Sequence, residues 1–173
     1  MDKIYAFDYM LSLFEEWCNE ESKGTMIFKN RSKLSVLKLL FLTAAPKKQG
    51  SRDLLDTFNN FYALPYGPVE SDIYNAIQNN ILPSYIVTER SILRKVNNHL
   101  PYTIDDYIHI KDAVDELKER NRRLITLNAF SLVEITHKWE SWKQSIAFAR
   151  LMDMSSYKMT KESIRNDRNK YFE

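Results

Sequence analysis

The sequence predicts a mainly α-helical protein, and three observations support this class. Apolar residues recur at helical spacing in several long segments of the 173-residue chain. Only 3 glycines and 5 prolines are present, too few for a turn-rich β-sandwich. Hydrophobic residues make up 44% of the chain and aromatic residues 13%, enough to form a buried core. We therefore expect one compact domain over residues 1–173, with about six to seven helices and a short β-hairpin or extended segment.

The first helix is expected over about residues 3–20. Apolar residues follow one another there at intervals of three or four: Ile4, Phe7, Leu11, Phe14 and Cys18. This spacing places them on one face, which we expect to pack on the rest of the domain. On this face the single cysteine is interpreted as a small buried hydrophobe. One cysteine also excludes an intramolecular disulfide and favours a reducing compartment.

The second helix is expected to begin after Ser32, a candidate N-cap, and to end before Pro46. It is apolar on nearly every face, which is typical of a central helix. Lys38 is the exception. Burial of an unpaired ammonium is costly, so we expect Lys38 to meet a carboxylate, with Asp72 and Glu134 as candidates, or a set of backbone carbonyls.

A change of pattern follows around the third glycine. Residues 58–66 are rich in aromatic side chains and are expected to be extended. Pro68 fits the first turn of a helix, because its missing N–H has no partner there in any case, and we expect that helix over residues 68–80. Gly67 is interpreted first as a joint between the two segments and second as a contact for an anionic group of a partner.

The rest of the chain is again mostly helical. Residues 81–103 contain two β-favouring runs, YIVT and ILRKV, which indicate a small hairpin. Four helices are then expected: from Thr103, from Asn128, over about Trp139–Met152, and from Thr160 to Phe172.

Charge and hydropathy exclude two broad classes. The formal net charge is +2, from 25 basic and 23 acidic residues, which gives no case for a strongly basic nucleic-acid binder. No window approaches the roughly 18 uninterrupted apolar residues of a membrane span, and the first residues lack a signal-peptide pattern. We expect a cytoplasmic protein with no membrane contact.

No constellation of reactive residues indicates an enzyme. His99, His109 and His137 lack the spacing of metal ligands, and the glycines are too isolated to form a phosphate-binding loop. We therefore expect no cofactor, no metal and no catalytic site. A hydrolase with His137 as its base is kept as a third hypothesis.

A basic run supports a second functional class. Lys118, Arg120, Arg122 and Arg123 would form the contact face of a nucleic-acid-linked regulator. Acidic residues precede the run, however, and alternating charge blocks on a helix usually form a solvated face. Nucleic acid is therefore not the expected partner.

Several short blocks occur in a fixed order along about residues 30–172: Lys38-Leu39-Leu40-Phe41, Tyr66-Gly67-Pro68-Val69, Leu132 through Thr136-His137, Trp142-Lys143 and Tyr171-Phe172. In this order they resemble the Panacea domain, the SocA-like antitoxin family that also includes phage-associated GepA-like proteins. Two positions depart from the family pattern. Leu64 stands where a tryptophan is common, and Pro65 stands where a polar or basic residue is frequent.

The resemblance implies a mainly helical antitoxin that neutralises a cognate toxin encoded nearby. Such domains bind the toxin directly or deliver it to a protease or its adaptor. The alternative is a phage-associated or nucleic-acid-linked regulatory accessory protein. The matching residues outside the glycine turn are expected to be structural: Lys38, Val69, Thr136, His137, Trp142 and Lys143. We expect Thr136 and His137 to close a helix, with the imidazole bonded to the backbone or to a tyrosine.

A partner-binding patch is expected near the glycine turn. Interface cores are enriched in aromatic residues. We expect Tyr62, Tyr66 and Trp139 to reach the surface beside Gly67 and Pro68 and to form part of the toxin contact.

Overall fold

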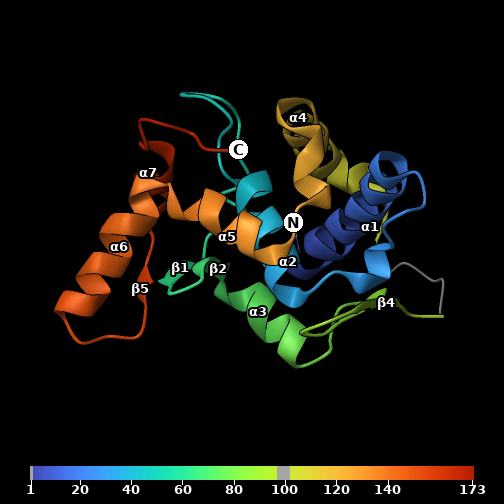
Figure 1. Cartoon of the computed structure of the whole chain (residues 1–173), viewed down its shortest axis with the longest axis horizontal. Coiled ribbons are helices and arrows are strands. Elements are labelled where there is room, and N and C mark those ends of the chain that lie inside the picture. The colour runs from blue at the N-terminus through green and yellow to red at the C-terminus, as the bar shows by residue number, and fades with distance from the viewer. Residues whose placement is uncertain (1, 97–101) are drawn as a thin grey trace.

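Helices account for most of the secondary structure, which confirms the expected mainly helical class (Figure 1). The structure is a computed structural model that describes residues 2–96 and 102–173. His99 lies outside these residues. The described part contains seven α-helices: α1 (Lys3–Ser22), α2 (Lys33–Ala44), α3 (Ser71–Gln78), α4 (Ile108–Arg120), α5 (Ala129–His137), α6 (Glu140–Leu151) and α7 (Lys161–Arg165). None of the helices in these two ranges has the length and apolar character needed to cross a membrane.

The helix starts follow from the capping residues of the sequence. Ser32 accepts a hydrogen bond from the N–H of Ser35, and the Ser35 hydroxyl accepts one from the N–H of Ser32, which forms a capping box at α2. Asn128 accepts from the N–H of Ser131 at α5, and Thr160 caps α7 in the same way. These three predicted starts are confirmed.

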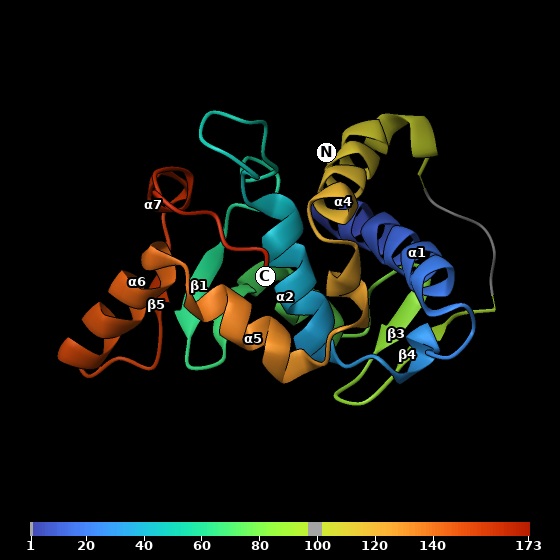
Figure 2. The same ribbon diagram turned by 45° about the horizontal axis from the view of Figure 1, so that its top comes forward.

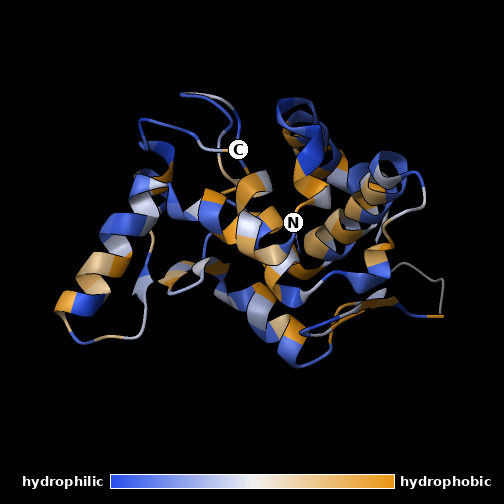
Figure 3. Ribbon diagram, in the orientation of Figure 1, coloured by the Kyte–Doolittle hydropathy of each residue, from blue (hydrophilic) through white to orange (hydrophobic). Residues whose placement is uncertain are grey.

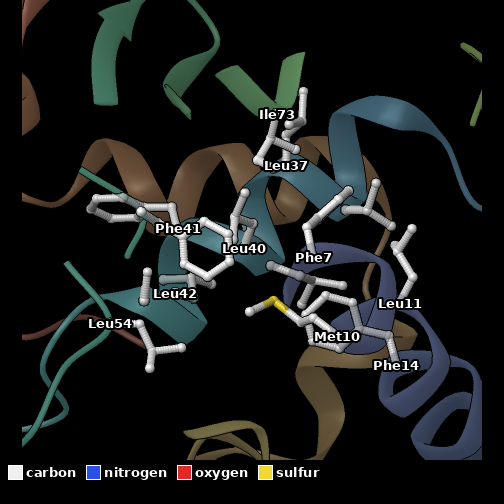
Figure 4. Packing of buried hydrophobic residues seen from close by; sticks show 14 of the residues in the cluster. Phe7, Met10, Leu11, Phe14, Leu37, Leu40, Phe41, Leu42, Leu54 and Ile73 are labelled. Atoms are coloured by element: carbon white, nitrogen blue, oxygen red, sulfur yellow. The ribbon is translucent and has the colours of Figure 1, made fainter. Parts of the chain in front are cut away.

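The core is built around α2. This helix packs against α4 and α5, while α1 packs against α4 (Figures 1 and 2). In Figure 4, Phe7 and Met10 of α1 lie beside Leu40 of α2. Side chains on every face of α2 are buried, among them Leu37 and Leu39. The expectation of a central helix is confirmed.

Two small antiparallel sheets complete the fold. The first has the order β2-β1-β5, formed by β1 (Phe61–Leu64), β2 (Gly67–Glu70) and β5 (Tyr157–Lys158). The second is the expected hairpin, formed by β3 (Tyr85–Val87) and β4 (Ile92–Arg94). The first sheet places β5, which follows α6, beside β1, although more than 80 residues separate these strands in sequence.

Pro68 corrects one expectation, because it lies in β2 and does not start a helix. It pairs with Ala63 across the hairpin, and β2 is an edge strand, where a proline is tolerated because one side needs no ladder bond. The helix begins later, at Ser71. Its N-cap is Glu70, whose carboxylate accepts a hydrogen bond from the N–H of Ile73.

The elements after α3 also differ in detail from expectation. Thr103 makes no side-chain cap and precedes a 3₁₀ helix. The last helix stops at Arg165, well before Phe172. Just beyond it, the buried carboxylate of Asp167 accepts hydrogen bonds from the N–H and hydroxyl of Ser141, which draws the chain toward α6. The three 3₁₀ segments of the described residues are η1 (Phe28–Asn30), η2 (Ile104–Tyr107) and η3 (Arg122–Thr126).

Candidate functional site

Lys38 is completely buried in the middle of α2. Its ammonium Nζ donates a hydrogen bond to the carbonyl oxygen of Pro68 at 2.5 Å. The expectation of a backbone carbonyl is confirmed, and the two carboxylate candidates are not its partners. Asp72 pairs with Lys3 at 2.5 Å, and Glu134 is exposed. Burial lowers the pKa of Lys38 to about 7.

Gly67 lies directly against this lysine. Its φ of +94° is in the region that favours glycine. A Cβ at this position would lie 2.6 Å from Thr136 Oγ1 and 3.2 Å from Lys38 Nζ. The glycine is therefore a joint, but it joins β1 to β2 and not an extended segment to a helix, which corrects that part of the expectation. Of the two strands, β2 packs on α2 and α5.

The end of α5 fixes the same turn from the other side. Thr136 and His137 close this helix, as expected. The His137 imidazole stacks on the indole of Trp142, with ring centroids 3.8 Å apart and planes at 10°. Trp142 Nε1 in turn donates to the carbonyl of Leu64 at 3.0 Å. Burial, and then the charge of Lys38, lower the pKa of His137.

Of the two partners expected for His137, the backbone is the one found: a hydrogen bond with the Pro65 backbone opposes the lowering of its pKa. The Nε2 atom is buried and has no hydrogen-bond partner among the described residues, so no tyrosine binds it there. Of the remaining family-motif residues, Val69 is buried and lies opposite Tyr62 in the hairpin. Lys143 is exposed and lies 3.9 Å from Glu140, an arrangement that contributes little stability.

Trp139 contradicts the expectation that it reaches the surface. It is completely buried, and its Nε1 donates to the carbonyl of Tyr171 at 3.0 Å. The rings of Phe41 and Phe172 pack edge-on against it at 5.1 and 5.7 Å. The physical reason is that its indole lies between Phe41 of α2 and Phe172 of the C-terminal segment, so it fills the seam between them.

The other expected contact residues divide by exposure. Tyr66, in the turn between β1 and β2, is 61% exposed. Tyr62 is half-buried, as the alternation along β1 requires. Gly67 and Pro68 are buried and therefore not available to a partner in this arrangement. Tyr66 alone of the five keeps a widely exposed ring.

A second group of exposed side chains was not anticipated from the sequence. Five apolar residues are exposed within ten positions at the end of α6 and the start of β5, and we call them the apolar tip: Phe148, Leu151, Met152, Met154 and Tyr157. The rings of Phe148 and Tyr157 contact each other at 4.5 Å. In Figure 3 the far end of α6 is orange where it projects from the body.

The apolar tip and Tyr66 lie at the same end of the first sheet. In the antiparallel pairing of β1 with β5, Tyr157 lies opposite Ala63, so the chain that follows α6 enters the sheet at the end where the β1–β2 turn lies. The buried side of α6 ends with Ile146 and Ala149. The apolar side chains of the tip lie outside that buried side and are exposed. The sequence feature that could have indicated this exposed cluster is the run LMDM at 151–154, where apolar residues lie at the end of a predicted helix and are followed by two serines.

Other candidates from the sequence have structural partners. Lys118 pairs with Glu20, and Arg122 pairs with Glu21 at 2.8 Å. His109 and His137 lie on different helices, and among the described residues no three His, Cys, Asp or Glu side chains are grouped to hold a metal ion. Sequence reasoning missed Glu70, which is completely buried and accepts hydrogen bonds from Lys3, Asn60 and Ile73.

The fold and the buried motif define a mostly helical domain whose shared residues hold one hairpin turn in place. A family model described as antitoxin SocA-like, Panacea domain, matches residues 36–143. The match covers more than half of the chain, and the chain belongs to this family. The resemblance drawn from the motifs is confirmed. No curated protein and no solved structure matches the chain.

Proposed function

We propose that this protein is an antitoxin that neutralises a cognate protein toxin by direct binding, without catalysing a reaction. Membership of the SocA-like antitoxin family supports the role. The observation that carries direct binding is the apolar tip, where five large apolar side chains are exposed on a projecting element. Exposed apolar clusters on proteins commonly mark interaction sites.

The composition of the tip suits a protein partner. Phenylalanine, tyrosine and methionine are enriched in the cores of interfaces, and methionine adapts to irregular surfaces. Tyr66 extends the same surface from the β1–β2 turn. The tip follows the residues matched by the family, 36–143, so we assign to it the contact that is particular to this protein's own toxin.

The regulatory alternative receives less support from the contacts. A nucleic-acid face needs basic side chains that are free to neutralise phosphates. Lys118 and Arg122 are instead held by Glu20 and Glu21, and Arg120 lies 5.9 Å from the ring of Phe172. These partners favour a structural role for the basic run.

Co-expression with the gene next to this one tests the proposal. The neighbour alone should arrest growth, and the wild-type protein should restore it. The double variant Leu151→Lys/Met154→Lys should fold and fail to restore growth, because both side chains are exposed and a lysine suits the end of a helix. Ile81→Lys is the matched control, since Ile81 is 53% exposed just after α3 and away from the tip.

The same strains separate direct binding from delivery to a protease. Direct binding predicts that the toxin stays at constant abundance and co-purifies with the wild-type protein. Falling toxin abundance would indicate protease delivery. A neighbour that is harmless, or that stays toxic beside soluble wild-type protein, would overturn the antitoxin role.

A further inference from the structure

Arg31 is a buried cation with unused hydrogen-bond donors. Its side chain is 6% exposed, and its Nη1 donates to the carbonyl of Leu127 at 2.6 Å. The Nε and Nη2 atoms are both buried and have no hydrogen-bond partner among the described residues. A guanidinium keeps its charge in proteins, so both its charge and its N–H groups carry a cost here.

The carboxylates of the described residues do not offset this cost. None of the ion pairs among the described residues includes it. The other close polar atom is the Met26 sulfur, 4.0 Å from Nη1. Burial lowers the pKa of Arg31, and the nearby thiol of Cys18 only partly opposes that effect. The site therefore has a positive charge without a matching negative one.

Two helix N-termini meet at this arginine. Arg31 directly precedes Ser32, the N-cap of α2, and the Leu127 carbonyl that it binds directly precedes Asn128, the N-cap of α5. The two helices pack together. Each N-terminus carries a partial positive charge. At α2 the N–H of Lys33 donates to the carbonyl of Thr88 and the N–H of Ser35 donates to the Ser32 hydroxyl, so α5 is the helix that offers free N–H groups.

A cavity opens between these two ends. Its volume is about 280 Å³, and its lining includes Arg31, Ser32, Ser35, Asn128 and Ala129. Asn128 accepts from the N–H of Ser131, which leaves the N–H groups of Ala129 and Phe130 without an intrahelical acceptor. The cavity has room for a tetrahedral oxyanion and part of a molecule attached to it.

We propose that this cavity binds a phosphate group, held by the guanidinium of Arg31 and the N-terminal end of α5. Nε and Nη2 present two parallel N–H donors, the geometry that pairs with two oxygens of one oxyanion. These atoms are closed to solvent in the arrangement described, so the guanidinium turns toward the cavity when the phosphate enters. This site is separate from the apolar tip and does not depend on toxin binding.

Thermal unfolding at constant ionic strength tests the proposal, with inorganic phosphate exchanged for chloride. The melting temperature of the wild-type protein should rise in a saturable way, by about 3 °C when phosphate is at about ten times its dissociation constant. Adenosine monophosphate in a second arm tells free phosphate from a phosphorylated small molecule. A saturable rise in either arm, with binding heat in calorimetry, supports the site.

Two variants separate binding from the general stabilising effect of phosphate salts. Arg31→Met removes the charge and keeps the buried bulk. Asn128→Asp keeps the N-cap and places a carboxylate in the cavity, where it pairs with Arg31 and repels phosphate. Both should lose the saturable rise, and should Arg31→Met fail to fold, Asn128→Asp decides. Equal shifts in the wild type and Asn128→Asp, or no saturable shift in either arm, would overturn the proposal.

Discussion

The ammonium of Lys38 and the carbonyl of Pro68 form a buried hydrogen bond of 2.5 Å that ties the central helix to an edge strand. Lys38 is fully enclosed, and no carboxylate within residues 2–96 and 102–173 pairs with its charge. The other residues of the family motif surround this bond: Gly67 follows the turn, and Thr136 covers it. The motif thus fixes the β1–β2 hairpin, whose turn contains the exposed Tyr66.

The first prediction concerns pH. The pKa of Lys38 is about 7 in the folded protein and 10.5 ordinarily, so between these values the unfolded chain binds more protons. The free energy of unfolding should therefore rise as pH increases from 6.5 to 8.5, by at most about 1.4 kcal/mol per pH unit for this group. Lys38→Met should flatten that rise in urea unfolding at several pH values.

Lys47 and an exposed lysine provide the comparison. Burial also lowers the pKa of Lys47 to about 7, so Lys47→Met should remove a separate part of the rise. Lys158→Met, at an exposed position of β5, should leave the profile as it is. If Lys38→Met and the wild type showed parallel profiles, the ammonium of Lys38 would have to be solvated in the native protein.

The second prediction is that Gly67→Ala destabilises the protein by about 2–5 kcal/mol. The left-handed backbone costs about 1–2 kcal/mol for a residue with a side chain, and overpacking adds about 1–3 kcal/mol. The new Cβ would lie 2.6 Å from Thr136 Oγ1. Chemical unfolding at pH 7.5 measures the loss.

Gly50→Ala is the matched control, because Gly50 has a φ of +72° with nothing within 4 Å of the added Cβ. It should cost only the backbone strain, about 1–2 kcal/mol. Adding Thr136→Ala to Gly67→Ala should recover part of the stability, since it removes the nearest atom. Equal losses for the two glycine variants would mean that the close approach to Thr136 does not matter.

The sequence predicted those parts of the fold that depend on local chemistry. Helical spacing and the capping residues Ser32, Asn128 and Thr160 predicted where three helices begin. Pro68 was misjudged because a proline after a glycine fits both a helix start and an edge strand. Only the pairing of β2 with β1, set by the register opposite Ala63, decides between them.

The candidate site was predicted less well, for a related reason. Whether an aromatic ring is buried depends on distant segments that cover it. Trp139 is covered by Phe41 and Phe172, which lie far away in sequence. The apolar tip is the opposite case, because nothing in the described chain packs over Leu151. A local sequence pattern does not show whether a distant segment will cover such a side chain.

The third prediction is that His137→Ala lowers stability by about 1–2 kcal/mol at pH 7.5 and leaves growth rescue intact when the protein is folded. The imidazole loses its stacking on Trp142. Its folded pKa is below the ordinary 6.5, so its contribution is present above that pH and is lost as pH falls. The difference between wild type and variant should therefore shrink at pH 5.5, as measured by urea unfolding.

His109→Ala, on α4, provides the control for loss of a partly buried histidine. It should not change the pH dependence assigned to His137. A His137→Ala variant with normal melting and lost rescue would place His137 in the toxin contact, contrary to this expectation.

The fourth prediction separates the two aromatic residues expected at the interface. Trp139→Ala should destabilise the protein by about 3–5 kcal/mol, because it empties a site between Phe41 and Phe172 and leaves the Tyr171 carbonyl without its donor. Tyr66→Ala should change stability by no more than about 0.5 kcal/mol, since its ring is 61% exposed. Differential scanning calorimetry compares the two variants.

Growth rescue then shows which ring meets the partner. Tyr66→Ala should melt like the wild type and rescue growth less well, because Tyr66 lies at the same end of the sheet as the apolar tip. Trp139→Phe should retain most of the stability and full rescue, since a smaller ring still fills much of the site. Normal rescue by Tyr66→Ala would remove the β1–β2 turn from the interface and confine the toxin contact to the apolar tip. Impaired rescue by a stable Trp139→Phe would show instead that the buried cluster shapes the binding surface.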